Sequence, residues 1–386
     1  MNTNYSEIVK EVILNKKSIN EYNLKFKEKI YISNELKKRK KLIDKFPEWG
    51  LNFELLLPNL LNIEQSSSEK TAEYKSKIIN YNNILDLTGG FGIDSYFFSK
   101  RAEKLYFNEK NFELFYISKK NFEKLNIKNV EFFNYDAVEF LKYVENKFDL
   151  IYLDPSRRDN HNKKIIRIEE YDPNLDNLLE YIKNKSDYLL LKTSPLLDIN
   201  YVLKKYQYIR KVIVISLENE VKELLFLFDF INTIQKIEYI AVLINQNITK
   251  EIYLSKDKSS INYSLPEIYL YEPDPAIMKL SFFGDLCNKY NLNKLEKNTH
   301  LFTNNCLNID FPGNIYEIKN IVKIDKKELK KTINNENANL KVRNLPIKTI
   351  ELKKKLKIND GGNYFVFATK LLNGKNRLII CNKVNR

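Results

Sequence analysis

Four carboxylates occupy equivalent places in this sequence, each at or just past the end of a short apolar run. They are Asp86, Glu109, Asp136 and Asp154. If these runs are strands of one parallel sheet, the acids meet at its carboxyl edge, where open α/β sheets bind ligands. Any one of them could instead cap a helix by chance, but four in succession favour a common site.

The spacing of these acids indicates which groups they could bind. Glu109 follows Asp86 by 23 positions, close to the offset of about 20 residues at which an acid meets ribose hydroxyls. A carboxylate accepts two hydroxyl hydrogen bonds, which suits a diol. Asp136-Ala137 could accept from an adenine amino group, and Asp86 could meet a cationic end of the same ligand.

A glycine-rich turn follows the first acid, in Asp86-Leu87-Thr88-Gly89-Gly90-Phe91-Gly92. Glycines let such a turn adopt positive φ and let a ligand approach the backbone closely. The dinucleotide fingerprint needs three glycines; Gly90 and Gly92 fill two positions, but Ser95 stands at the third. The turn therefore predicts a nucleotide-like cofactor other than a dinucleotide.

The fourth apolar run ends in Asp154-Pro155-Ser156-Arg157-Arg158. Proline fixes φ and has no N–H, so nearby backbone carbonyls can point into a site. An acid and carbonyls could accept from an amino group and orient its lone pair. Arg157 or Arg158 could bind a phosphate bidentately, with a structural salt bridge as the alternative. Lys192, at the end of a later run, is a further candidate phosphate contact.

A fold that brings these residues together needs alternating strands and helices. Residues 78–245 show this alternation, which is typical of a parallel sheet covered on both faces. We expect strands over 84–87, 104–108, 130–134, 150–153, 188–192, 212–217 and 238–244. The longest apolar stretch, 224–231, contains Asp229 and is too short to span a membrane.

Composition limits the class of protein. A chain of 386 residues with 43% hydrophobic residues can form two or three domains. The net charge of +14 favours a polyanionic partner such as RNA, although lysine is abundant everywhere. Three scattered cysteines and two histidines predict neither a metal site nor a disulfide framework. Without a leader or an apolar run of about 18 residues, we expect a cytoplasmic protein that does not enter the membrane.

The N-terminal region, residues 1–75, has apolar residues at helical spacing between lysines. We interpret its basic cluster, 37–41, as a solvated helix face, with a phosphate contact as the alternative. Gln65-Ser66-Ser67-Ser68-Glu69 fits a capping box from Ser66 to Glu69. Alternatively, this segment closes over the cofactor.

The C-terminal region reads as a small α+β domain. Its expected elements after residue 316 are helices over 326–333 and 347–356, a basic strand over 340–343, and hairpin strands over 364–369 and 377–381. Asn373-Gly374 is a typical hairpin turn.

The glycine turn resembles motif I of the class I S-adenosylmethionine-dependent methyltransferases, and the other three acids resemble motifs II, III and IV. Motif IV of the nitrogen methyltransferases carries Asp/Asn-Pro-Pro-aromatic; here Ser156 replaces the second proline and Arg157 the aromatic. Nearly the whole chain is similar to a bacterial family of class I methyltransferases with a C-terminal THUMP-like domain. The features that carry this resemblance are Gln65-Ser66-Ser67-Ser68-Glu69, residues 85–92, residues 154–158, Tyr271-Glu272-Pro273, Val342-Arg343-Asn344-Leu345-Pro346 and Asp360-Gly361-Gly362.

The resemblance implies an α/β fold: a Rossmann-like class I methyltransferase sheet, an N-terminal helical region and a small C-terminal α+β (THUMP-like) domain. The expected segments are 1–75 (helical), 76–245 (methyltransferase), 246–313 (linker and small ferredoxin-like segment) and 314–386 (THUMP-like and RNA-binding). S-adenosyl-L-methionine would be bound by Asp86, Thr88, Gly89, Gly90, Gly92, Glu109, Asp136 and Ala137. The catalytic residues would be Asp154, Pro155 and Ser156. RNA would be gripped by Arg157, Arg158, Lys192, Lys341 and Arg343.

The sequence thus predicts an S-adenosylmethionine-dependent methyltransferase that modifies a base nitrogen of RNA, either tRNA or rRNA. One alternative is an RNA-binding protein on a catalytically silent methyltransferase scaffold. Another is methylation of a protein or a small molecule.

Overall fold

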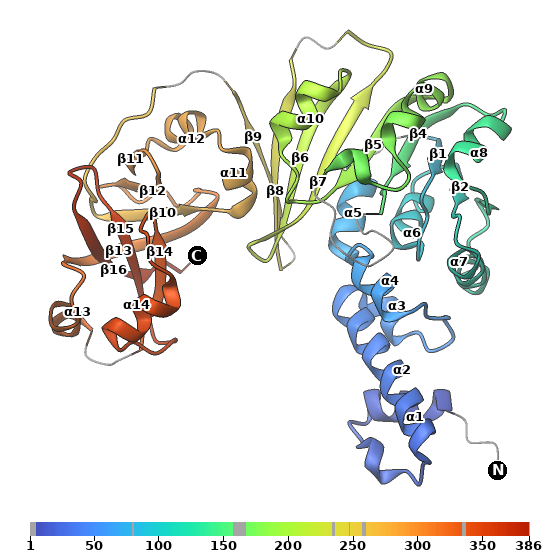
Figure 1. The fold of residues 1–386 in the computed structure, drawn as a ribbon, viewed down its shortest axis with the longest axis horizontal. Coiled ribbons are helices and arrows are strands. Elements are labelled where there is room, and N and C mark those ends of the chain that lie inside the picture. Colours follow the sequence, from blue (N-terminus) through green and yellow to red (C-terminus); the bar gives the residue numbers. More distant parts are fainter. Residues whose placement is uncertain are drawn as a thin grey trace. The chain divides into compact units, whose positions relative to one another are not determined.

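The computed structural model describes residues 5–78, 81–156, 167–233, 236–246, 248–256, 260–333 and 337–385. The chain divides into two compact units (Figure 1). The first comprises Met1–Val212 and Glu223–Ile237, and the second comprises Ile213–Lys222 and Glu238–Arg386. The boundaries of these two units differ from those of the four predicted segments. The segment boundaries stay a prediction.

The first unit begins with helices, in agreement with the spacing of its apolar residues. They are α1 (Tyr5–Leu14), a 3-10 turn (Ile19–Glu21), α2 (Phe26–Lys45), α3 (Pro47–Leu51), α4 (Leu60–Gln65) and α5 (Glu69–Ile78). Arg39, within the basic cluster of α2, is buried and donates to the carbonyls of Asn52 and Leu55. This member of the cluster is therefore structural, whereas its neighbours Lys38 and Lys40 are at least partly exposed.

A sheet with its helices follows. Its elements are β1 (Asn83–Asp86), α6 (Ile93–Ser99), β2 (Lys104–Asn108), α7 (Phe112–Lys124), β3 (Val130–Phe133), α8 (Ala137–Tyr143), β4 (Phe148–Leu153), a 3-10 turn (Ile168–Glu170), α9 (Leu175–Lys185), β5 (Ser186–Thr193), α10 (Ile199–Lys205), β6 (Ile209–Leu217) and β7 (Glu220–Asp229). The strand order within the first unit is β3-β2-β1-β4-β5-β7. The first five are parallel, and β7 runs antiparallel to β5.

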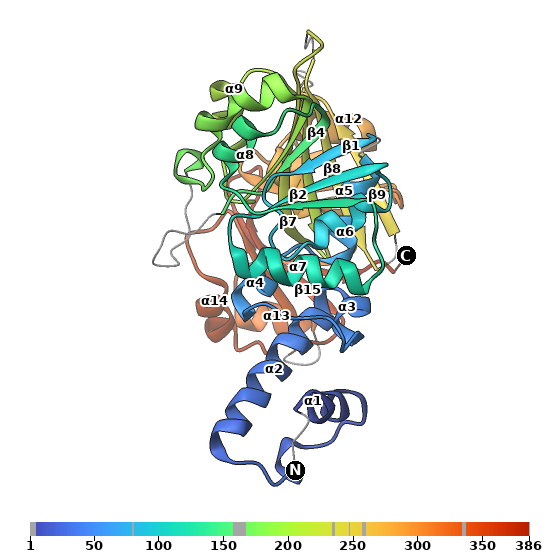
Figure 2. The same cartoon turned by 90° about the vertical axis from the view of Figure 1, so that its right-hand side faces the viewer.

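This order brings β1 between β2 and β4, with Leu85 opposite both Tyr106 and Ile151. Helix α6 packs against β2 and α7 against β3 (Figure 2), while α9 packs against β5. Because the central strands are parallel, their carboxyl ends open on one edge of the sheet, so the acids that follow β1, β2 and β4 face a common region.

The sequence analysis missed one strand of this sheet. The strand beside β5 is β7, which includes most of the apolar stretch 224–231. The strand predicted over 238–244 is present as β8 (Glu238–Asn245). β6 and β7 are joined at Glu218 and Asn219, whose φ angles of 50° and 60° suit a tight hairpin turn. Because this polar turn contains no glycine, no turn signal in the sequence marks the boundary between β6 and β7.

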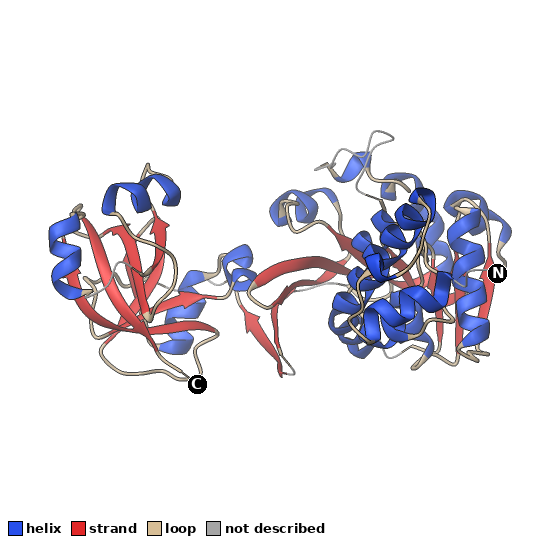
Figure 3. Cartoon of the chain, turned by 90° about the horizontal axis from the view of Figure 1, so that it is seen from below, coloured by secondary structure: helices blue, strands red, loops and turns tan. Residues whose placement is uncertain are grey.

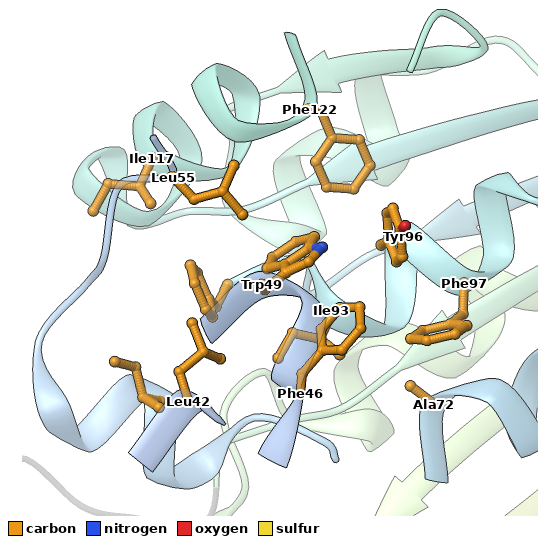
Figure 4. Packing of buried hydrophobic residues seen from close by; sticks show 12 residues of the cluster. Leu42, Phe46, Trp49, Leu55, Ala72, Ile93, Tyr96, Phe97, Ile117 and Phe122 are labelled. Atoms are coloured by element: carbon orange, nitrogen blue, oxygen red, sulfur yellow. The ribbon is translucent and has the colours of Figure 1, made fainter. Parts of the chain in front are cut away.

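Trp49 lies within an aromatic core that joins the N-terminal helices to the sheet helices (Figure 4). Its indole ring packs within 5.5 Å of the Phe46, Phe91 and Tyr96 ring centroids. Trp49 and Phe46 are fully buried, so burial of apolar area anchors α2 and α3 on α6 and α7.

The second unit contains its own sheet and helices (Figure 3). Its elements are β8 (Glu238–Asn245), β9 (Ile248–Leu254), β10 (Tyr269–Pro273), α11 (Pro275–Leu280), α12 (Phe283–Tyr290), β11 (Asn293–Glu296), β12 (Thr299–Asn304), β13 (Gly313–Val322), α13 (Lys326–Thr332), β14 (Asn339–Arg343), α14 (Thr349–Leu356), β15 (Tyr364–Lys370) and β16 (Asn376–Lys383). The order is β11-β12-β10-β13-β16-β15-β14, and only β14–β15 is parallel among the printed pairs of this sheet. The C-terminal α+β prediction is confirmed. Within the described residues, no helix is both long and apolar enough to cross a membrane.

Candidate functional site

A cavity of about 250 Å³ lies at the carboxyl edge of β1, β2 and β4. All four acids singled out by the sequence, Asp86, Glu109, Asp136 and Asp154, line it. The glycine turn 88–92 and Ala137, Pro155 and Ser156 line it as well. The structure therefore brings every predicted cofactor-binding and catalytic residue to one cavity.

The glycine turn has its shape for two different reasons. Gly92 has a φ of 85° and occupies the N-cap of α6, a left-handed conformation that a side chain would strain. Gly89 is required for space, because a Cβ there would lie 2.2 Å from the ring of Phe107. Gly90 also has positive φ, and a Cβ there would lie 3.9 Å from the carbonyl oxygen of Thr88, an ordinary contact.

Asp86 ends β1 and is 1% exposed. Its Oδ2 accepts from the hydroxyl of Ser95, and its Oδ1 accepts from the backbone N–H of Thr88. The pKa of Asp86 is raised to about 8, mainly by burial; the charges of Asp94 and Asp154 add to the rise, and the hydrogen bonds from Ser95 and Thr88 oppose it. A cation in the cavity would therefore favour the ionised form of Asp86.

Glu109 lies directly after β2 and reaches back to the glycine turn. Its Oε2 accepts from the N–H of Gly90 at 2.8 Å, and its Oε1 accepts from the N–H of Asn111 at 2.7 Å. Burial raises the pKa of Glu109 in spite of these bonds. Each carboxylate oxygen can accept a second hydrogen bond, so the group can still take hydroxyl donors from a ligand.

Asp136 caps α8, as its side chain accepts from the N–H of Val138. Asp136 therefore both caps a helix and lines the cavity, where its neighbours are Tyr135 and Ala137. The helix N-terminus adds a positive partial charge at this place.

Asp154 and Ser156 are held by backbone contacts on both sides. The N–H of Asp154 donates to Thr88 Oγ1 at 2.7 Å, which ties the end of β4 to the glycine turn. The N–H of Ser156 donates to the carbonyl of Asp172, and the N–H of Asp172 donates back. Asp172 also forms an ion pair with Lys110 at the cavity wall. Arg157, Arg158 and His161 lie outside the described residues.

Lys192, which was predicted to contact a phosphate, is buried beside Asp154. Its side chain is 4% exposed, and its Nζ lies 2.6 Å from Asp154 Oδ2. Burial would lower the pKa of Lys192, but the carboxylates of Asp154, Glu223 and Asp94 outweigh it and raise the pKa. The ammonium is thus a buried partner of Asp154.

Behind the cavity lies a buried ion network that the sequence did not reveal. Lys75 pairs with Glu223 at 2.6 Å and with Asp94 at 3.0 Å, and Asp94 also accepts from Tyr152. Burial would raise the pKa of both Glu223 and Asp94, but Lys75 and Lys192 lower it. In the sequence, Lys75 looks like any lysine of a solvated helix, so only the fold could show its partners.

The serine-rich segment before α5 lines the cavity through Asn62, Gln65, Ser66 and Ser67. Of the two sequence interpretations, the capping box from Ser66 to Glu69 is wrong, since Ser68 precedes α5 and its hydroxyl accepts from the N–H of Thr71. Ser66 instead ends α4. Cavity lining agrees with the alternative that this segment closes over the site.

In the second unit, the predicted RNA contacts Lys341 and Arg343 are both paired with Glu272. Lys341 Nζ lies 2.5 Å from Oε2 and Arg343 Nη2 lies 2.9 Å from Oε1. Burial would raise the pKa of Glu272, but the two cations lower it. These ion pairs connect two of the motifs that carry the family resemblance, Tyr271-Glu272-Pro273 and residues 342–346. Both cations therefore have a structural partner within the protein.

Three family models match parts of the chain. Residues 68–194 match the family described as conserved hypothetical protein 95, residues 269–312 match a ferredoxin-like domain, and residues 313–383 match a THUMP domain-like family.

Two relatives extend these matches. A crystal structure of a proposed methyltransferase from Porphyromonas gingivalis W83 superposes with a TM-score of 0.86 at 26% identity, covering 99% of this chain and 98% of that one. An uncharacterised RNA methyltransferase of Mycoplasma mobile is 28% identical over 110 residues, which are 28% of this chain. The matched region spans only 30% of the length of that curated relative.

A parallel sheet of this order, with a glycine turn and acids around one cavity at its carboxyl edge, defines a Rossmann-like methyltransferase. Together with the matches above, it identifies this chain as a methyltransferase that carries a THUMP-like α+β domain at its C-terminal end.

Proposed function

We propose that this protein transfers a methyl group from S-adenosyl-L-methionine to a nitrogen of an RNA base, in tRNA or rRNA. The observation that carries the proposal is that Asp86, Glu109, Asp136 and Asp154 line one cavity together with the glycine turn.

The donor set suits this cofactor. Glu109 would accept from the ribose hydroxyls, Asp136 with Ala137 would bind the adenine, and Asp86 would face the methionine end. Gly90 lines the cavity and has no side chain, which allows close approach of a ligand to the backbone. When bound, the cofactor supplies a methyl group on a sulfonium, and the acidic lining suits that positive charge.

The acceptor side is built by Asp154 and Pro155. The Ser156 backbone is already paired with Asp172, so we assign the acceptor contacts to the Asp154 side chain and the Pro155 carbonyl. Two acceptors can take the two hydrogens of an amino group and direct its lone pair into the cavity. Methyl transfer is an in-line displacement, for which orientation supplies much of the rate.

An RNA acceptor is supported by the THUMP-like match and by the description of the Mycoplasma relative. Since Lys341 and Arg343 pair with Glu272, we assign phosphate contacts mainly to the exposed lysines that surround α13 and α14. These are Lys323, Lys327, Lys348, Lys354, Lys355 and Lys357. The two helices that these lysines surround pack on each other over one apolar cluster.

Nucleoside mass spectrometry of total tRNA and rRNA from a deletion strain tests the function. A methylated nucleoside that disappears on deletion, and returns on incubation of this RNA with the purified protein and S-adenosylmethionine, is the expected result. RNA with an unchanged set of methylated nucleosides would contradict it.

The RNA surface has its own test. Replacing Lys354 and Lys355 with glutamate should weaken binding of purified tRNA at least tenfold and flatten the dependence of binding on salt. The double arginine variant at these positions keeps the charge and should bind like the wild type. Equal binding by both variants would exclude this surface.

A further inference from the structure

Lys192 is buried directly behind the acceptor side of the cavity. Its Nζ donates to Asp154 Oδ2 at 2.6 Å and to Ser67 Oγ at 3.1 Å. The residues that line the cavity include both of these partners but not Lys192. A buried ammonium is tolerated only with such partners, so the contact with Asp154 is a fixed feature of the site.

Ser67 sets the place of this ammonium. Its hydroxyl accepts from Lys75 at 2.7 Å and from Lys192, and it donates to Asp94 at 2.8 Å. A hydroxyl has one hydrogen and two acceptor sites, so this set uses its full capacity. Lys192 is therefore held in position independently of any ligand.

Asp154 is fixed at two points. Its backbone N–H donates to Thr88 Oγ1, and its side-chain Oδ2 is occupied by Lys192. The side chain remains 25% exposed and lines the cavity. Lys192 takes one acceptor site of Oδ2, so Oδ1 and the second site of Oδ2 can still bind an acceptor group.

We propose that Lys192 is a positioning residue for methyl transfer: it fixes the orientation of the Asp154 carboxylate and balances its charge without touching the substrate. This inference rests on the proposed function, because Asp154 can be positioned only for an acceptor that binds there.

Removal of the Lys192 charge would change the balance of charge around Asp154. The groups that face Lys192 and Asp154 come from six elements and are Lys45 (α2), Lys75 (α5), Asp86 (β1), Asp94 (α6), Tyr152 (β4) and Glu223 (β7). Without the Lys192 charge, Lys45 and Lys75 are the cations that remain near Glu223. Asp154 would lose its direct partner, and its carboxylate would be free to turn away from the acceptor.

The test compares Lys192→Gln with Lys75→Gln, the matched control. Each variant removes one buried ammonium that is bonded to Ser67, but only Lys192 contacts Asp154. The probe is transfer of tritiated methyl from S-adenosylmethionine to total RNA of the deletion strain, measured as kcat and KM at one pH. Calorimetry with S-adenosylhomocysteine measures the cofactor pocket separately.

We expect Lys192→Gln to lose at least 30-fold in kcat, with the KM for RNA and the affinity for S-adenosylhomocysteine within threefold of the wild type. Lys75→Gln should lose less than tenfold in kcat. A kcat within threefold of the wild type for Lys192→Gln, or the same loss in both variants, would overturn the inference.

If Lys192→Gln does not fold, Lys192→Arg replaces it. A planar guanidinium keeps the charge but has a different geometry from an ammonium, so we expect at least a tenfold loss of rate with folding retained. A wild-type rate in that variant overturns the positioning role. Wild-type protein that methylates no RNA would refute the proposed function, and the inference would fail with it; an active wild type with insensitive Lys192 variants refutes the inference alone.

Discussion

Glu109 Oε2 accepts a hydrogen bond from the backbone N–H of Gly90, 2.8 Å away. One carboxylate thus holds the glycine turn after β1 and faces the same cavity from the end of β2. Removing it should affect both the shape of the turn and the binding of a ligand.

Glu109→Ala should lower the affinity for S-adenosylmethionine by about 10- to 100-fold, because hydrogen bonds to a charged group contribute about 1.5–3 kcal/mol. Isothermal titration calorimetry measures the change. Glu113→Ala, an exposed acid in the first turn of α7, serves as the control and should bind as the wild type does. Unchanged affinity in Glu109→Ala would remove this residue from the cofactor site.

The affinity for S-adenosylmethionine should increase with pH up to about 8, the pKa of buried Asp86. The sulfonium favours the ionised carboxylate, and S-adenosylhomocysteine lacks that charge. Both ligands carry the same amino acid group, so the ratio of their dissociation constants isolates the effect. We expect this ratio to change by up to about tenfold per pH unit below pH 8; a constant ratio from pH 6 to 9 would contradict the role of Asp86.

Asp86 should also destabilise the folded protein as pH rises. Its pKa is about 8 in the fold and ordinarily 3.8, so the folded state binds the extra proton between these values and stability falls as pH increases through that window. Asp86→Asn should remove the effect. In urea unfolding, the stability of the variant relative to wild type should increase between pH 5 and 8, by at most about 1.4 kcal/mol per pH unit. A constant difference would show that Asp86 is already ionised.

Lys75→Met should destabilise the protein by about 3–5 kcal/mol, the usual cost of leaving buried carboxylates unpaired. Lys77→Met is the control on the same helix, since Lys77 and its partner Glu73 are 53% and 48% exposed; it should cost less than about 1 kcal/mol. Chemical denaturation of both variants measures the contrast. Equal stability of the two would mean that the buried network adds nothing.

Gly89→Ala and Gly90→Ala should differ in stability. A Cβ on Gly89 would collide with the buried ring of Phe107, and overpacking of this kind costs about 1–3 kcal/mol. A Cβ on Gly90 would make only an ordinary contact, so that variant should lose about 1 kcal/mol through its positive φ. Thermal unfolding tests the order; a more stable Gly89→Ala would contradict the packing at this turn.

Sequence reasoning predicted a feature only where the interactions that determine it are local in the chain. Strands 104–108 and 130–133, and the C-terminal helices and hairpin, follow local apolar periodicity and turn chemistry, so their predicted bounds lie within a few residues of the observed ones. The sequence analysis missed β7 because a polar turn at Glu218 and Asn219 precedes its apolar residues. Both turn residues have positive φ, but neither is a glycine that would indicate a turn.

The sequence by itself determined the glycine turn, the four acids and the strands that precede them, because each is encoded by neighbours in the chain. Only the tertiary structure decided the partners of the charged groups. Lys192 was expected at a phosphate and lies on Asp154, and Lys341 and Arg343 lie on Glu272. A lysine side chain looks the same in sequence whether water or a carboxylate surrounds its ammonium, and the choice is made by burial, which depends on residues 38 to 148 positions away.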